Sequence, residues 1–190
     1  MLPRLLPLFA LPLLLAACAN DIRVTSDWDP SSDLAARRTF TLATGPETGV
    51  IAPVGRSREI GTPFYRTRVQ NAILGELLAS GRAEASPEQA QLRVVWAAQS
   101  ETRHQSDTVA FRNYVPYQDP WRIERYETRE YRHEEQTLTV TLQEPATGKV
   151  LWTGSVRAPE IEDASPEDRE KRVRELVRRL FAKLPKPAAR

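Results

Sequence analysis

The stretch TLTVTLQEPATGKVLWTGSV, residues 137–156, decides the fold of this chain. Its first part alternates threonines with apolar residues, which are Leu138, Val140 and Leu142. That period of two is typical of a strand with one buried and one wet face. Residues 145–148 are turn-forming. A second strand follows, and its apolar face carries Val150, Trp152 and Val156. The stretch therefore predicts a β-hairpin.

Weaker alternation outside the hairpin predicts four more strands. They are residues 22–28, 38–42, 92–99 and, as a charged and less regular candidate, 121–132. Residues 43–61 are rich in glycine and proline, and residues 103–120 are polar and aromatic with two prolines. Both of these segments are predicted to be irregular.

Two amphipathic helices are predicted, each opened by a capping residue and a proline. The first begins at Thr62-Pro63 and ends before Gly81, and its apolar stripe is Phe64, Val69, Ile73, Leu74, Leu77 and Leu78. The second begins at Ser165-Pro166 with the capping-box acid Asp168, and its stripe is Val173, Leu176, Val177, Leu180, Phe181 and Leu184. The expected fold is α+β: a largely antiparallel sheet, open to some mixed pairing, with both helices on one face.

The amino terminus has the organisation of a bacterial lipoprotein signal. Arg4 precedes an apolar run from Leu5 to Leu15, which is too short for a membrane-spanning helix. The run ends in Leu15-Ala16-Ala17-Cys18, which resembles a lipobox. We therefore expect residues 1–17 to be cleaved as a signal peptide. Cys18 is the expected lipidation site, with diacylglycerol on its sulfur and a further acyl chain such as palmitate on its amine.

The expected anchor places the domain close to a membrane. Two or more acyl chains hold a protein stably, so lipidated Cys18 serves as the membrane contact. Ala19 follows it rather than aspartate, and by analogy with enterobacterial sorting this favours the outer membrane, facing the periplasm. Residues 18–21 form a tether of about 15 Å at full extension. One α+β domain is expected over residues 22–185 and a disordered tail over 186–190.

Composition excludes some classes of function. Cys18 is the one cysteine, so no internal disulfide can form. Without Arg4 the mature chain carries 26 Lys+Arg against 25 Asp+Glu, a near-neutral balance. A nucleic-acid-binding protein needs a clustered basic surface, so no nucleic-acid partner is expected.

No catalytic or metal-binding constellation stands out. His104 and His133 lack the spaced partners of a zinc motif, so no metal and no cofactor are expected. Five glutamates lie close together in sequence: Glu124, Glu127, Glu130, Glu134 and Glu135. A glycosidase-type carboxylate pair is conceivable. Their alternation with arginines better fits an ion-paired sheet surface, so no catalytic residue is assigned.

An aromatic cluster is the remaining candidate site. It consists of Phe111, Tyr114, Tyr117 and Trp121. Aromatics with polar tips suit a ligand or partner surface. The alternative is a loop folded over the sheet to complete the core.

Several stretches resemble the domain-of-unknown-function 4136 family of bacterial lipoproteins. They are residues 24–29 with Arg38-Thr39-Phe40, the helix end Leu77-Leu78-Ala79-Ser80-Gly81 leading into residues 91–94, and the hairpin motifs Thr147-Gly148-Lys149 and Trp152-Thr153-Gly154. Glu144-Pro145 departs from the pattern before the hairpin turn. The resemblance implies the fold and an envelope address, and it transfers no catalytic residues.

Three functions are consistent with the sequence. The first is a non-enzymatic envelope lipoprotein that has a binding, structural or assembly role and contacts an unknown envelope protein or ligand. The second is a small-ligand or lipid carrier that uses residues 103–121. The third is an enzyme that acts on envelope polymers through the acidic segment.

Overall fold

The computed structural model describes residues 22–44, 48–50, 60, 62–112, 123–161 and 163–185. The signal segment, Cys18, the tether and the tail lie outside these residues. Within the described part of the chain, no helix is long and apolar enough to cross a membrane.

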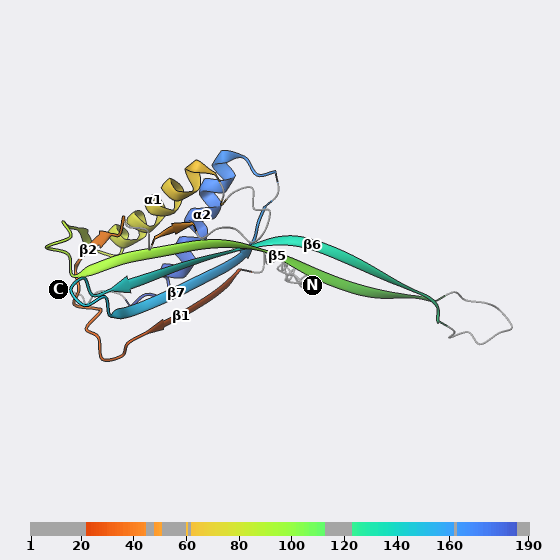
Figure 1. Cartoon of the computed structure of the whole chain (residues 1–190), viewed down its shortest axis with the longest axis horizontal. Helices are drawn as coiled ribbons and strands as arrows, with labels where there is room; N and C mark the ends of the chain where they lie inside the picture. The colour runs from red at the N-terminus through yellow and green to blue at the C-terminus, as the bar shows by residue number, and fades with distance from the viewer. Residues whose placement is uncertain are drawn as a thin grey trace, which may run out of the picture.

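The described residues form seven strands and two helices (Figure 1). In chain order they are β1 (Arg23–Trp28), β2 (Thr39–Leu42), β3 (Gly49–Val50), α1 (Pro63–Ala79), β4 (Ala83–Glu84), β5 (Leu92–Arg112), β6 (Ile123–Gln143), β7 (Val150–Pro159) and α2 (Pro166–Phe181). The sheet has the order β1-β7-β6-β5-β2-β4, with β3 also paired to β5. β1, β7, β6 and β5 pair antiparallel, whereas β2 and β3 pair with β5 in parallel. Both helices cover one face, which confirms the α+β fold with a mixed sheet.

The predicted hairpin is formed by β6 and β7, with Val140 opposite Gly154. One detail of the prediction is wrong. The register shifts beside Leu142, so Leu151 is an extra residue in β7 and is buried together with Trp152. Val150 is consequently 47% exposed rather than part of the apolar face. A bulge of this kind reverses the side on which the preceding residues point.

Helix α2 packs as its sequence predicts. The Ser165 hydroxyl accepts a hydrogen bond from the Asp168 backbone N–H, which is the expected N-cap. All six stripe residues are buried: Val173, Leu176, Val177, Leu180, Phe181 and Leu184. The Phe181 ring lies 5.8 Å from the Trp152 ring, centroid to centroid, and so joins the helix to the centre of the sheet.

Helix α1 is rotated relative to the prediction. Its buried residues are Tyr65, Val69, Ala72, Ile73 and Leu77. Phe64 and Leu78 are exposed, so their assignment to the stripe is wrong. Tyr65 and Ala72 complete the helical spacing with Val69 and Ile73, and this pattern outweighs the greater hydrophobicity of Phe64.

Arg82 is a buried charge that joins the ends of the two helices. It follows Gly81, whose φ of +85° lets the chain leave α1 in a left-handed conformation. The Arg82 side chain is 3% exposed and donates hydrogen bonds to Ser80 Oγ (2.9 Å) and to the Pro185 carbonyl (3.1 Å). Burial, together with nearby Arg38, lowers the pKa of its guanidinium. The sequence alone gives no sign of this contact.

Strands β5 and β6 run far beyond the rest of the sheet (Figure 1). β7 stops at Pro159, opposite Glu135, which itself faces Glu101 of β5. Beyond this point residues 102–112 and 123–134 form a two-stranded ribbon, here called the arm. At about 3.3 Å per residue it extends roughly 35 Å from the body.

The arm corrects one prediction and confirms another. Residues 103–112 are strand, not irregular, whereas the charged candidate at 121–132 is strand from Ile123 onward and continues into the hairpin. A period-two pattern reports a buried face, and the arm buries neither face. The extended conformation there follows from pairing with the opposite strand.

We predict that Gly154→Ala destabilises the domain. A Cβ at this position would run into the Trp152 ring and lie 2.7 Å from a Leu180 methyl carbon. Such overpacking costs about 1–3 kcal/mol. Urea denaturation measures the change in the free energy of unfolding. The control is Ser155→Ala, on the opposite face of the same strand. This substitution removes one hydrogen bond of a hydroxyl group, which should cost about 1 kcal/mol or less.

Candidate functional site

The arm is the candidate site because it has two open edges. β5 pairs with β3 only as far as Ala98, and β6 pairs with β7 only as far as Glu135. Beyond these residues, the described strands of the arm pair with each other alone. An isolated two-stranded ribbon is marginally stable in water, and an open edge is a template for further strand pairing. A binding partner would therefore stabilise the arm.

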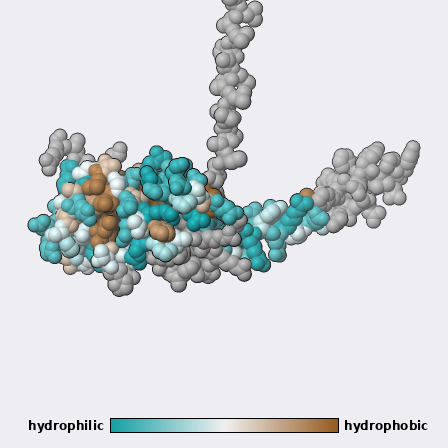
Figure 2. All heavy atoms as spheres, turned by 90° about the horizontal axis from the view of Figure 1, so that it is seen from above, coloured by the Kyte–Doolittle hydropathy of each residue, from teal (hydrophilic) through white to brown (hydrophobic). Residues whose placement is uncertain are grey.

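Polar side chains cover both faces of the arm. The face that continues the helix-covered side carries Thr102, His104, Ser106, Thr108 and Ala110, opposite Glu134, Arg132, Glu130, Thr128 and Tyr126. The other face carries Arg103, Gln105, Asp107 and Val109, opposite His133, Tyr131, Arg129 and Glu127. Residues 104–110 are all exposed, and Figure 2 shows a mainly hydrophilic arm.

Ion pairs and hydrogen bonds fix the base of the arm to the body. Glu135 pairs with Arg103 of β5 (3.0 Å) and with Arg157 of β7 (3.7 Å). Glu134 accepts a hydrogen bond from the Thr102 hydroxyl (2.7 Å). These contacts connect all three strands where β7 ends, so the direction of the arm is set by the body.

Among the arm residues whose side chains are described, three large apolar side chains are exposed. They are Val109 (43%), Tyr126 (64%) and Tyr131 (48%). Tyrosine is enriched in the cores of protein interfaces because it combines a large contact area with a polar tip. The arm thus offers interface-type side chains within a charged surface.

The arm keeps apart the histidines and glutamates that were considered as metal-binding or catalytic residues. His104 and His133 point to opposite faces, as do Glu127 and Glu130. Glu127 instead pairs with Arg129 (3.4 Å), in agreement with the predicted ion-paired surface. Among the described residues, no group of three or more histidine, cysteine or acidic side chains could hold a metal ion.

The predicted aromatic site lies mostly outside the described residues. Phe111 is in β5 near the end of the arm, and its side chain is not described. Tyr114, Tyr117, Trp121 and Cys18 lie outside the described residues altogether. The ligand-contact role of these aromatics and the lipidation of Cys18 therefore stay predictions.

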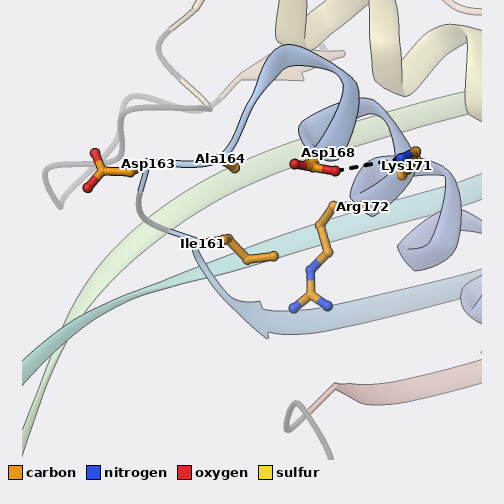
Figure 3. A pocket seen from close by; sticks show the side chains of 6 residues that line it. All are labelled: Ile161, Asp163, Ala164, Asp168, Lys171 and Arg172. Carbon is orange, nitrogen blue, oxygen red and sulfur yellow. Dashed lines mark ion pairs between the residues drawn. The ribbon is translucent and has the colours of Figure 1, made fainter.

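A surface hollow of about 500 Å³ lies where β7 leads into α2 (Figure 3). Ile161 lines it together with Asp168, Lys171 and Arg172. Its polar groups already have structural partners: Asp168 belongs to the helix cap and pairs with Lys171 (3.7 Å), and Arg172 bonds the Pro159 carbonyl (3.4 Å). The hollow is therefore part of the helix start rather than a convergent binding site.

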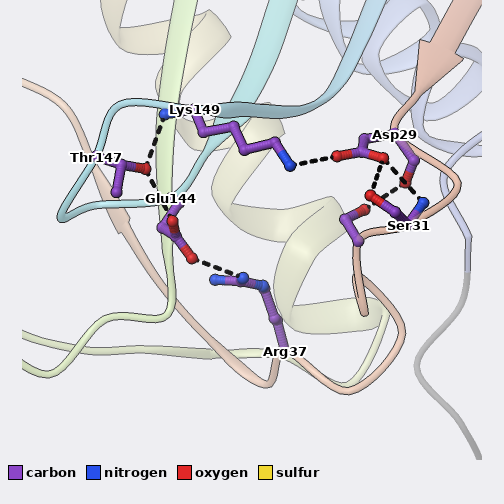
Figure 4. A network of polar contacts seen from close by, with 7 residues as sticks. Asp29, Ser31, Arg37, Glu144, Thr147 and Lys149 are labelled. Carbon is purple, nitrogen blue, oxygen red and sulfur yellow. Dashed lines mark hydrogen bonds and ion pairs between the residues drawn. The ribbon is translucent and has the colours of Figure 1, made fainter.

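A polar network closes the end of the domain that lies away from the arm (Figure 4). Lys149 Nζ lies 2.6 Å from an Asp29 carboxylate oxygen, so the hairpin turn is tied to the end of β1. Arg37 bonds Glu144 at 2.9 Å, and Thr147 donates to the same carboxylate at 2.8 Å. The family-like residues 147–149 thus have a structural role in the turn.

Contacts within the network shift the pKa values of its charged side chains. Hydrogen bonds from Lys149 and from Ser31 hold the pKa of Asp29 at about 2, below its ordinary 3.8. The same contact with Asp29 raises the pKa of Lys149. The hydrogen bond from Arg37 lowers the pKa of Glu144. The charged forms are therefore the ones that stabilise the turn.

The fold and the arm define an α+β domain with a mixed sheet and a protruding two-stranded ribbon. A family model, "Domain of unknown function (DUF4136)", matches residues 24–186. The chain therefore belongs to the DUF4136 family, as the sequence motifs predicted. No curated protein matches the chain.

Several solved structures are similar to the chain at low sequence identity. The PelC dodecamer from Paraburkholderia phytofirmans is 11% identical over 88% of this chain and 99% of its own, with a TM-score of 0.50. A PDZ domain protein from Parabacteroides distasonis is 13% identical over 88% of this chain and 37% of its own, with a TM-score of 0.51. A DUF4136 protein from Bacteroides thetaiotaomicron is 16% identical over 85% and 95%, with a TM-score of 0.48.

We predict that the Asp29–Lys149 pair stabilises the fold in a pH-dependent way. The folded-state pKa of Asp29 is lowered, so its contribution is complete above its ordinary value of 3.8 and is lost as pH falls toward about 2. Asp29→Asn should lower the unfolding free energy at pH 7 but make little difference near pH 2. Denaturation at both pH values measures this. Asp33→Asn, which removes an exposed carboxylate in the same connection, is the control.

We also predict that the body folds without the arm. Replacing residues 104–132 by Asn-Gly joins Arg103 to its partner His133 through a two-residue turn. Every apolar residue that the structure describes as buried lies outside this segment, so the unfolding free energy should stay within about 1 kcal/mol of the parent. Leu180→Ala, a core truncation, should cost about 2–5 kcal/mol in the same assay. Loss of cooperative unfolding on arm removal would refute the prediction.

Proposed function

We propose that this chain is a non-enzymatic lipoprotein of the bacterial cell envelope that uses the arm to bind a protein partner. Lipid on Cys18 holds it to a membrane, most simply the outer membrane facing the periplasm. One observation carries the binding role: the arm extends from the body with two open strand edges and with exposed tyrosines.

The position at which β1 begins supports a role at a membrane surface. Arg23, at the start of β1, pairs with Arg157 of β7, two residues from the strand end where the arm begins. The tether from Cys18 would therefore leave the domain at the base of the arm. Its reach of about 15 Å would keep the arm close to the lipid. The polar network would lie at the far end of the domain.

A macromolecular partner suits the arm better than a small ligand. Small-molecule sites are concave and bury most of the ligand surface. The described part of segment 103–121 is an exposed ribbon with polar faces instead. The PelC protein with the same fold is a dodecamer, which supports an assembly role for this chain as well.

The anchor is tested with Cys18→Ala in the full chain. This variant should lose acyl labelling and move from the membrane fraction to the soluble fraction, because no other covalent link to lipid is proposed. Cys18→Ser provides a second variant without the acylated thiol. Membrane fractionation that does not change in either variant would contradict the proposal.

The binding role is tested by photo-crosslinking in cells. A crosslinking amino acid at Tyr126 or Tyr131 should give adducts of defined mass, since both side chains are exposed on the arm. The matched control is Phe64, which is 67% exposed on α1 but lies on the body. Equal or stronger capture at Phe64 would remove the arm from the proposal.

A further inference from the structure

The outer edge of β6, the edge that does not face β5, is open along one stretch of the arm. Its boundary toward the body is Glu134, whose carbonyl accepts a hydrogen bond from the Glu160 backbone N–H (2.8 Å). From His133 to Ile123, the described structure pairs β6 only with β5. Thr128 lies between Glu127 and Arg129 on this edge. Antiparallel pairing of two copies with Thr128 as the midpoint would place Thr128 opposite Thr128.

Residues at equal distances on the two sides of Thr128 suit each other as partners across the axis. In the register centred on Thr128, Glu127 of one copy faces Arg129 of the other, and the two-fold axis repeats this pair. Glu130 faces Tyr126, again twice. Unlike charges directly opposite each other stabilise antiparallel strands, and like charges destabilise them. No like-charged pair occurs in this register.

The side chains at the centre of this register are at least partly exposed. Arg129 and Glu127 are 57% and 35% exposed, and each contacts the other along a single strand at 3.4 Å. Thr128 is exposed, and its hydroxyl lies 3.2 Å from that of Thr108 on the neighbouring strand. The open edge contains no proline and no lysine, the residues that commonly block edge pairing.

The pattern of charge selects the kind of partner. A membrane or nucleic-acid surface would favour one sign, whereas the arm alternates acids with arginines. An edge strand of mixed charge is repelled by most other edge strands, because like charges then face each other. It pairs favourably with a strand whose charges are complementary at each position. For the β6 edge, that complement is a second β6 edge.

We infer that the partner of the arm is a second copy of this chain. The two β6 edges pair antiparallel about Thr128 and form a four-stranded sheet, β5-β6-β6-β5, with the bodies at opposite ends. Pairing gives each β6 a second neighbouring strand and covers its open edge, which the isolated ribbon lacks. This inference rests on the proposed function, because it names the partner of the same arm.

Cysteine crosslinking of the full chain tests the register. Thr128→Cys should give a disulfide-linked dimer as the main product under mild oxidation, because the two residues meet on the axis. Thr108→Cys is the matched control at the same height on the arm. Its two copies would be three strand spacings apart, about 14 Å, which is beyond disulfide reach. The parent chain, whose one cysteine is Cys18, controls for crosslinking through that residue.

Charge reversal tests the complementarity by sedimentation of the purified full chain in detergent. Arg129→Glu converts both symmetric Glu127–Arg129 contacts into repulsions and should raise the dimer dissociation constant about tenfold. Glu127→Arg should act similarly. The double variant restores both contacts and should return the constant to the parent value. Unfolding curves of each variant establish that the body stays folded.

Each result decides the inference. A Thr128→Cys dimer, without one from Thr108→Cys, supports it. Equal crosslinking of both variants, or a parent that remains a monomer at every concentration, overturns it. Binding of the arm to vesicles of anionic lipid with no dimer would assign the arm to a membrane and also overturn it. Failure here is distinct from failure of the proposed function, since photo-crosslinking would still capture a different protein.

Discussion

The contact between Trp152 and Gly154 is the constraint on which the rest of the fold depends. Both residues lie on the helix-covered face of β7, and the absence of a side chain at Gly154 leaves room for the indole. Trp152 is fully buried and touches Phe181, so the same ring positions α2. Because β7 lies between β1 and β6, this one contact orders three strands and a helix.

Sequence patterns predicted the longer elements that have one buried face, though not every residue of that face. The hairpin and α2 follow their periodicity because burial selects the same residues that the pattern selects. Three features of the structure differ from the predicted pattern, each for an identifiable physical reason. A bulge exposed Val150, helical geometry preferred Tyr65 over the more apolar Phe64, and pairing alone kept the arm extended. Periodicity carries no information about the bulge or the arm, whereas in α1 the helical spacing itself selects Tyr65.

The candidate site was only partly accessible to sequence reasoning. Charge alternation within residues 122–135 correctly indicated an ion-paired sheet surface, and Glu127–Arg129 is one such pair. The projection of that surface beyond the body depends on where β7 ends, which is a property of the register. The burial of Arg82 was equally hard to predict, because an arginine is ordinarily exposed and its partner Pro185 is distant in the sequence.

The continuity of β5 and β6 has a mechanical consequence. Each strand runs unbroken from the core of the body into the arm, so a pull along the arm is transmitted directly to the central strands. Hydrogen bonds between antiparallel strands lie perpendicular to the strands. Such a pull therefore loads many of them together in shear, instead of opening them one after another. A domain built in this way can hold tension between two attachment points without unfolding first at its weakest bond.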